Sequence, residues 1–153
     1  MAVAKPAGLA TQAAAGIPSV EAWARETLVA GGEAGYLGVP HRLDRAVSGV
    51  LLLAVTPRAA RRLSRQFERR QVRKTYVAVT AVPADALSLV QPATEWRDHV
   101  AKVPDEPRGR IVAAGAGGRE AVTHIRRITE VEFDGQPRRI IQLEPLTGRM
   151  HQL

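Results

Sequence analysis

The densest cluster of chemically reactive side chains in the sequence is His41-Arg42-Leu43-Asp44-Arg45. Asp44 lies shortly before the apolar run Val50–Val55, and a carboxylate held next to a rigid strand is well placed for catalysis. The two flanking arginines would keep this carboxylate ionised at neutral pH. A surface loop in which Asp44 simply pairs with these arginines explains the same residues, and chemistry alone favours that simpler interpretation.

A second polar cluster, Thr147-Gly148-Arg149-Met150-His151-Gln152, follows the last apolar run of the sequence. Arg149 could bind a carboxylate or a phosphate through two parallel hydrogen bonds. The alternative is an ordinary polar strand end, and these residues taken alone again favour it. The histidines have no spacing typical of a metal site, so no metal is expected. They are His41, His99, His124 and His151.

Four elements are predicted in the first half of the sequence, with strands and helices in alternation. They are a strand at 1–4, a helix from Ser19 to about Ala30, a strand at 50–55 and a helix at 58–70. Ser19 can cap the first helix, and Thr56-Pro57 suits the start of the second. The strand at 50–55 is apolar without interruption, so we expect it to be buried on both faces.

The second half of the sequence is predicted to be mostly β-structure. Strands are expected at 74–82, 121–133 and 138–146. The last two flank Asp134-Gly135-Gln136-Pro137, which is typical of a hairpin connection. The Pro- and Gly-rich stretch 83–118 is expected to hold one short strand and a loop. Together these elements predict an α+β fold with a mixed, largely antiparallel sheet flanked by helices.

Length and composition limit the possible classes of protein. The 153 residues suit one domain or part of a larger one, and 45% apolar with 24% charged residues is a globular composition. The absence of cysteine excludes disulfides and thiolate catalysis, and it fits a cytoplasmic location. The longest apolar run is far too short for a membrane helix, and the early Pro and Gly residues argue against a signal peptide.

The charge balance points to a polyanionic partner. The formal net charge is +7 and the isoelectric point is near 10.9. The predicted helix at 58–70 combines an apolar stripe with a face of arginines, at positions 58, 61, 62, 65 and 69. This face could follow the phosphates of a nucleic acid, or it could be an ordinary solvated surface, and the sequence favours neither.

Five segments, taken in order, resemble the motifs of the RluA family of RNA pseudouridine synthases. His41-Arg42-Leu43-Asp44-Arg45 with Ser48-Gly49 is similar to the family signature. The others are Val3–Leu9, Phe67–Arg73 with Lys74-Thr75-Tyr76, Glu120-Ala121-Val122-Thr123, and Thr147–Gln152. The resemblance extends over the whole chain. Each motif is weak alone, and the five in this order carry the resemblance together.

The resemblance implies an isomerase that acts on RNA without a metal or an organic cofactor. Such an enzyme breaks the N1–C1′ bond of a uridine, turns the uracil and joins C5 to C1′. Asp44 matches the catalytic aspartate of the family, and Arg149 matches the arginine that pairs with it. Tyr76 matches the tyrosine that lies against the target base. The family implies a pseudouridine synthase fold.

The resemblance also implies RNA contacts, because a uridine in paired RNA must be flipped out to be reached. Arg42 matches the residue that enters the vacated stack. Arg45, Lys74 and His151 are further expected RNA-binding residues. Ribosomal RNA is the favoured substrate, with transfer RNA as the alternative, and we expect a monomer.

Two positions depart from the family pattern, and so do the ends of the sequence. Ala46-Val47 stand where polar residues are more usual, and Met150 replaces a small hydroxyl residue. We expect residues 1–153 to form the catalytic domain, truncated at its C-terminal end and without a separate N-terminal RNA-binding domain. Two alternatives remain: a catalytically inactive RNA-binding remnant, and a basic interaction domain with chance motifs.

Overall fold

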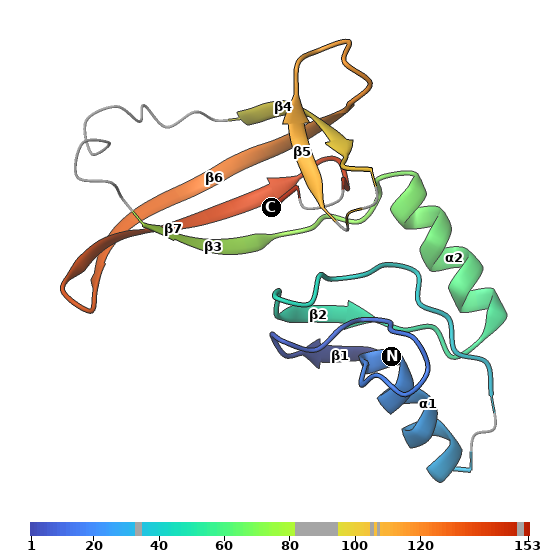
Figure 1. Ribbon diagram of the computed structural model, residues 1–153. Coiled ribbons are helices and arrows are strands. Elements are labelled where there is room, and N and C mark those ends of the chain that lie inside the picture. The colour runs from blue at the N-terminus through green and yellow to red at the C-terminus, as the bar shows by residue number, and fades with distance from the viewer. Residues whose placement is uncertain (33–34, 82–94, 105, 107, 150–151) are drawn as a thin grey trace. The chain divides into compact units, whose positions relative to one another are not determined.

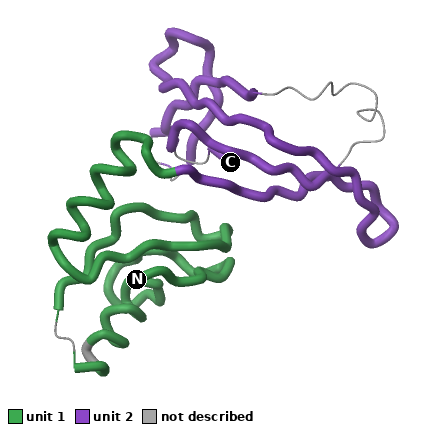
Figure 2. Tube along the Cα trace, turned by 180° about the vertical axis from the view of Figure 1, so that it is seen from behind, with its two compact units in different colours: residues 1–72 green, residues 73–153 purple. Residues whose placement is uncertain are grey.

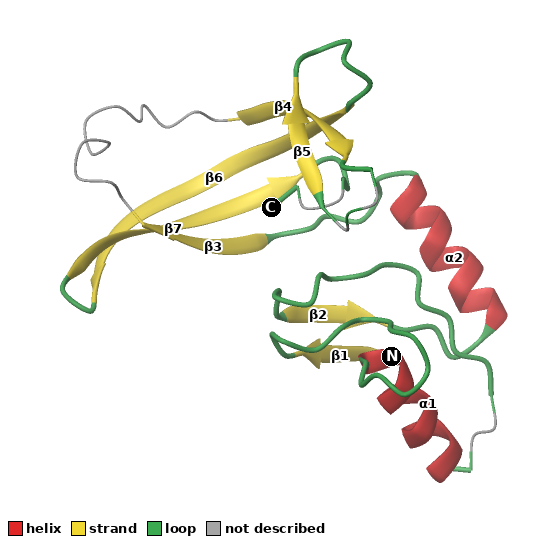
Figure 3. Cartoon of the chain, viewed as in Figure 1, coloured by secondary structure: helices red, strands yellow, loops and turns green. Residues whose placement is uncertain are grey.

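The chain forms two compact units, Met1–Val72 and Arg73–Leu153, coloured green and purple in Figure 2. The computed structural model describes all residues except 33–34, 82–94, 105, 107 and 150–151 (Figure 1). Among the described residues, both helices belong to the first unit, and the second unit is built from strands (Figure 3). The predicted α+β fold class is confirmed.

In the first unit a two-stranded antiparallel sheet joins β1 (Ala2–Lys5) to β2 (Gly49–Leu52), with Ala2 opposite Leu52. Leu51 is fully buried, whereas Val50 is 66% exposed. The expectation of burial on both faces is therefore wrong for Val50. Neighbouring side chains of a strand point to opposite faces, and only the face that carries Leu51 packs against the core of this unit.

Both helices of this unit begin where their capping residues predict. The backbone N–H of Ala22 donates to Ser19 Oγ at 3.2 Å at the start of α1 (Val20–Ala30). The N–H of Ala59 donates to Thr56 Oγ1 at 3.1 Å at the start of α2 (Pro57–Glu68), whose first residue is a proline. Each hydroxyl satisfies a donor that would otherwise lack a partner in the first helical turn.

The second unit is a five-stranded sheet of order β3-β7-β6-β4-β5, in which all neighbours run antiparallel. Its strands are β3 (Tyr76–Ala81), β4 (Glu95–Lys102), β5 (Gly109–Val112), β6 (Arg119–Phe133) and β7 (Gln136–Pro145). The described part of the stretch 83–118 thus holds two strands, where one was expected. Charged residues dominate β4, so it lacks the apolar alternation by which a strand is usually found.

The hairpin between β6 and β7 has a two-residue turn. Phe133 pairs with Gln136, and the intervening Asp134 and Gly135 have positive φ angles of 51° and 64°. Two successive left-handed residues define the turn whose twist matches that of the flanking strands, and Asp-Gly is a preferred sequence for it.

Among the described residues, neither helix combines the length and the apolar character needed to cross a membrane.

The hairpin turn makes a prediction about stability. Replacing Gly135 by Ala should lower the free energy of unfolding by about 1 kcal/mol, because Cβ disfavours the left-handed conformation. Gly135→Asn should cost less, because Asn tolerates that conformation. Urea titrations followed by circular dichroism measure both. An alanine variant as stable as the parent chain would contradict the turn assignment.

Candidate active site

The loop that carries Asp44, residues His41–Ser48, is fixed from inside by the segment that follows β1. We call it the Asp44 loop. Thr11 is 2% exposed, and its hydroxyl donates to the carbonyl of Leu43 at 2.7 Å. The same oxygen accepts from the Leu43 N–H at 3.0 Å. A single buried side chain therefore satisfies both backbone groups of the residue that precedes Asp44.

Lys5 supplies the second anchor of the Asp44 loop. Its side chain is buried, and Nζ donates to the carbonyls of Pro6 at 2.9 Å, Leu9 at 2.6 Å and Arg45 at 3.3 Å. Burial lowers the pKa of Lys5, and the negative charge of Asp44 opposes that shift. Lys5 thus provides a cation that attracts Asp44. Sequence reasoning did not assign Lys5 a role, because a lysine is normally expected on the surface.

Arg45 takes part in the same set of contacts. The N–H of Gly8 donates to the Arg45 carbonyl, and Arg45 Nε donates back to the Gly8 carbonyl, both at 2.8 Å. Gly8 has a φ of +85°, a conformation that suits glycine. The Arg45 side chain therefore contributes to holding the loop, in addition to the RNA contact predicted for it.

His41 connects the Asp44 loop to β2 and to α2. Its Nε2 accepts a hydrogen bond from the backbone N–H of Leu52 at 2.9 Å. Its ring stacks on Phe67 of α2, with centroids 4.5 Å apart and planes at 21°. Burial lowers the pKa of His41, which favours the neutral ring that an accepting nitrogen requires. His41 is therefore a structural residue of this loop.

Asp44 does not form the simple ion pair with a neighbouring arginine that a plain surface loop would predict. Asp44 is half-buried, Arg42 and Arg45 are exposed, and no ion pair between described residues joins Asp44 to either arginine. A carboxylate on an internally fixed loop is well suited to meet a ligand.

The second polar cluster is closed by Gln152 and Thr147 in the other unit. Thr147 Oγ1 accepts from the Val122 N–H at 2.9 Å and donates to Gln152 Oε1 at 2.8 Å. Gln152 Nε2 donates to the Val122 carbonyl at 3.0 Å and to Thr123 Oγ1 at 2.9 Å. Together they fasten both ends of the Thr147–Gln152 motif to β6. His151 and Met150 lie outside the described residues.

Arg149 is held inside this motif. Its N–H donates to Gln152 Oε1 at 3.0 Å, and its Nε donates to the Glu120 carbonyl at 2.8 Å. Lys74 Nζ donates to the Thr147 carbonyl at 2.7 Å, which ties the start of β3 to the same motif. Tyr76 is the first residue of β3, is half-buried and lies opposite Leu143. The sheet thus brings the regions of Lys74, Tyr76 and Arg149 to one end.

A buried carboxylate strengthens that end of the sheet. Glu144 is 7% exposed and forms ion pairs with Arg73 at 2.5 Å and with Arg126. The hydrogen bond from Arg126 lowers the pKa of Glu144, and the bond from Arg73 adds to this effect, while burial opposes it. Arg73 comes directly before Lys74, so Glu144 anchors the entry to β3. Sequence reasoning missed this residue.

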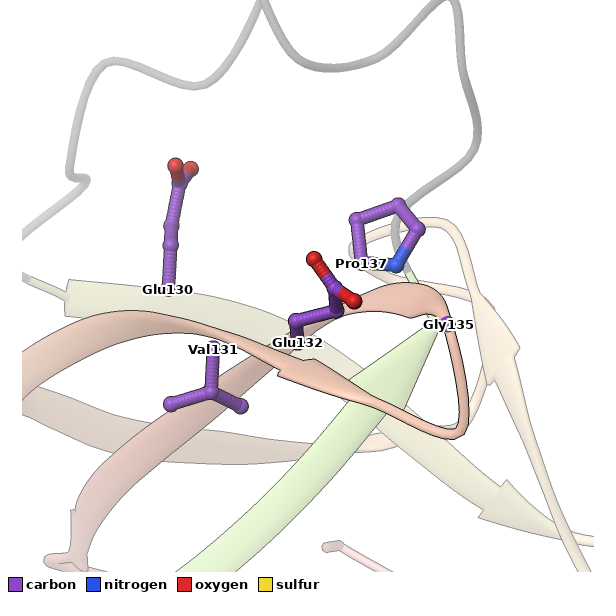
Figure 4. A pocket seen from close by; sticks show the side chains of 5 residues that line it. All are labelled: Glu130, Val131, Glu132, Gly135 and Pro137. Carbon is purple, nitrogen blue, oxygen red and sulfur yellow. The ribbon is translucent and has the colours of Figure 1, made fainter.

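A hollow of about 310 Å³ lies on the β6–β7 hairpin, lined by Glu130, Val131, Glu132, Gly135 and Pro137. Figure 4 shows Glu130 and Glu132 pointing to one side of the strand and Val131 to the other. None of the predicted site residues lines this hollow. Its two carboxylates would repel phosphate, so it does not suit a nucleic-acid substrate.

The structure brings the predicted residues together in two groups. Arg42, Asp44 and Arg45 share one loop of the first unit, and Lys74, Tyr76 and Arg149 lie in the second. The convergence of Asp44 with Tyr76 and Arg149 stays a prediction.

Comparison with known proteins identifies the class. The family model for RNA pseudouridylate synthase matches residues 1–153. The chain is 34% identical over 155 residues to an uncharacterized RNA pseudouridine synthase of Zymomonas mobilis, which covers 100% of this chain and 65% of that protein. The chain therefore belongs to the RNA pseudouridylate synthase family. This membership rules out a basic domain with chance motifs.

Further relatives agree with this family. The tRNA pseudouridine synthase C of Salmonella typhi is 36% identical over 121 residues, which covers 74% of this chain and 44% of that protein. The dual-specificity RNA pseudouridine synthase RluA of Escherichia coli is 35% identical over 116 residues, covering 74% and 48%. The chain thus spans about half the length of these relatives.

Solved structures show the same fold. The human RNA pseudouridylate synthase domain containing 4 matches with a TM-score of 0.70 at 24% identity, over 99% of this chain and 57% of that one. The human RNA pseudouridylate synthase domain containing 1 matches with a TM-score of 0.71 at 21% identity, over 99% and 57%. The predicted pseudouridine synthase fold is confirmed.

The contact between Thr11 and Leu43 can be tested directly. Thr11→Val keeps the shape and leaves two buried backbone groups without partners, so it should lower the free energy of unfolding by about 2–3 kcal/mol. Thr11→Ser keeps the hydroxyl and should retain most of that stability. Chemical denaturation measures both variants. A Thr11→Val variant as stable as the parent chain would show that the hydrogen bonds to Leu43 do not contribute to stability.

The Glu144 ion pairs predict a dependence of stability on pH. Because its pKa in the folded state lies below the ordinary value of 4.5, ionised Glu144 stabilises the fold above that pH. This contribution is lost as the pH falls further, through the pKa of the folded state. Glu144→Gln should therefore destabilise the protein at pH 7, and the difference from the parent chain should shrink below about pH 4.5.

The measurement is the urea midpoint of both proteins between pH 3 and pH 7. The exposed Glu132 forms no ion pair with another described residue, so Glu132→Gln is the matched control. A gap between Glu144→Gln and the parent chain that stays constant over the whole range would contradict this account.

Proposed function

We propose that this chain carries the catalytic carboxylate of an RNA pseudouridine synthase, and that Asp44 is that carboxylate. The observation that supports this most is the Asp44 loop itself. Lys5, Thr11 and His41 fix its backbone from inside. Precise positioning of a reacting group, without the need to reorganise, is what a catalytic site requires.

The chemistry gives the carboxylate a definite task. Breaking the N1–C1′ bond of uridine builds positive charge on the sugar, and an adjacent anion can stabilise this charge or trap it covalently. The uracil then turns, C5 bonds to C1′, the C5 proton leaves and N1 gains a proton. Atoms balance without any further reactant.

The remaining site residues have complementary proposed roles. Arg149 pairs with Asp44 and keeps it oriented, while Tyr76 stacks on the uracil and its hydroxyl helps to remove the C5 proton. Arg42 is an exposed residue of the Asp44 loop, and its planar guanidinium can enter the space left by the flipped base. Arg45, Lys74 and His151 contact the RNA.

The proposed substrate is a structured RNA. The sequence favours ribosomal RNA with transfer RNA as the alternative, and the name of the Salmonella relative supports transfer RNA. The proposed reaction requires no metal and no organic cofactor with either RNA.

The test of this proposal is Asp44→Asn in the full chain. The amide keeps the shape and removes the charge, so pseudouridine formation should fall by at least about a thousandfold, since loss of charge stabilisation costs several kcal/mol. RNA affinity should change less than about threefold, because one half-buried carboxylate contributes little to phosphate binding. Release of tritium from [5-³H]uridine RNA measures turnover, and filter binding measures affinity.

The matched control is Asp98→Asn, because Asp98 is exposed on β4 and forms no ion pair with another described residue. It should retain full turnover. Turnover retained by Asp44→Asn would remove Asp44 from the catalytic role. A parent chain that binds RNA but shows no turnover would instead favour the inactive RNA-binding remnant.

A further inference from the structure

One face of α2, together with the residue that caps its C-terminal end, carries five arginines in a narrow band. At about 100° per residue, they fall within an arc of roughly 100°, and they extend along about 16 Å of the helix axis. We call this band the arginine stripe, and its members are Arg58, Arg61, Arg62, Arg65 and Arg69. All five are exposed, whereas Ala60 is buried and Leu63 and Phe67 are half-buried on the opposite face. The helix is therefore amphipathic, and its outer surface is mostly positive.

The stripe lacks counter-charges within the part of the chain that the structure describes. None of its guanidinium groups forms an ion pair or hydrogen bond there, and Glu68 is the one acidic residue of α2. Several arginines elsewhere are paired with carboxylates: Arg25 with Glu21, Arg97 with Glu95 and Glu120, and Arg139 with Glu130. Other exposed arginines, such as Arg110, Arg119 and Arg127, are also unpaired among the described residues, but they are spread over the strands of the sheet. The stripe differs because it gathers five unpaired arginines on one face of one helix.

An ordinary solvated helix face does not explain this arrangement well. Like charges three or four residues apart destabilise a helix, and the stripe contains several such pairs, for example Arg58 with Arg62 and Arg61 with Arg65. A face designed only for solubility relieves this repulsion by alternating the signs of its charges. A bound polyanion would relieve it in the complex instead.

The stripe is also fixed relative to the Asp44 loop. Phe67 projects from the opposite face of α2 and stacks on His41, the first residue of that loop, at 4.5 Å. His41 in turn accepts from the backbone of β2 at 2.9 Å. A polyanion bound along the stripe would therefore lie at a defined distance from Asp44 within the same unit.

We propose that the arginine stripe of α2 binds the phosphate backbone of the substrate RNA, outside the uridine pocket. Arginine suits this task because its planar fork donates two hydrogen bonds to one phosphate. Phosphate contacts set register and affinity without reading the base sequence. The inference rests on the proposed function for the identity of the RNA, and it assigns the stripe to binding rather than to chemistry.

The experiment compares two triple variants of the full chain with equal loss of charge. The stripe variant is Arg61→Gln with Arg62→Gln and Arg65→Gln. The control is Arg110→Gln with Arg119→Gln and Arg127→Gln, three exposed arginines of the sheet that form no ion pair among the residues described. The probe is a uridine-containing RNA hairpin, and its affinity is measured between 50 and 200 mM salt.

In the stripe variant, affinity at the lowest salt should fall by roughly tenfold or more, and the slope of log affinity against log salt should become shallower by about 2. The thermal midpoint of the free protein should rise at low salt, because the repulsion is removed. The control should change the slope by less than half as much. Asp44→Asn should leave the slope unchanged, so a failed catalytic assignment does not affect this readout.

Equal changes in slope for the stripe and control variants would overturn the proposal, since they would reflect net charge alone. Vesicles of phosphatidylserine provide a second probe. If the stripe variant lost vesicle binding and kept its RNA affinity, the stripe would be a membrane contact and the proposal would be wrong.

Discussion

The buried ammonium of Lys5 is the interaction on which the arrangement around Asp44 depends. It sits at the end of β1 and donates to three carbonyls, one of them from Arg45, forty residues further along the chain. A buried charge is costly unless it is fully hydrogen-bonded, so the surrounding chain must turn its carbonyls inward. That requirement defines the backbone path on both sides of Asp44. Thr11 and Gly8 complete the same constraint with hydrogen bonds to Leu43 and Arg45.

In the second unit, neutral polar side chains and one carboxylate fix the backbone in place of a buried ammonium. The side chains of Thr147 and Gln152 satisfy the backbone groups of Val122 that the sheet leaves open. Glu144 supplies the charged contact by pairing with Arg73 and Arg126. In both units, therefore, polar side chains fix irregular backbone, around Asp44 in one unit and around Arg149 in the other. Burial of apolar surface alone would not specify those conformations.

Much of this fold could be predicted from the sequence, because local signals agreed with it. Ser19 and Thr56 mark the helix starts, and Asp134-Gly135 marks the hairpin. The place of Asp44 before an apolar run and the order of the motifs indicated Asp44 and Arg149 as candidate site residues. The roles of Lys5 and Glu144 could not be found this way, since a charged residue is normally expected on the surface. Their burial depends on partners 40 and 71 residues away, and no local pattern encodes such contacts.

The two polar networks also explain why the charges of this basic chain divide into two kinds. The arginines that pair with carboxylates, such as Arg73, Arg126 and Arg139, hold strands in register, and their charge is compensated within the protein. The arginines of α2 have no such task, because the helix is fixed by its apolar face and by the stack of Phe67 on His41. Their charge is therefore available to a ligand without loss of structure. A chain that must both fold and bind a polyanion benefits from this separation, since ligand contacts then do not compete with the ion pairs that stabilise the sheet.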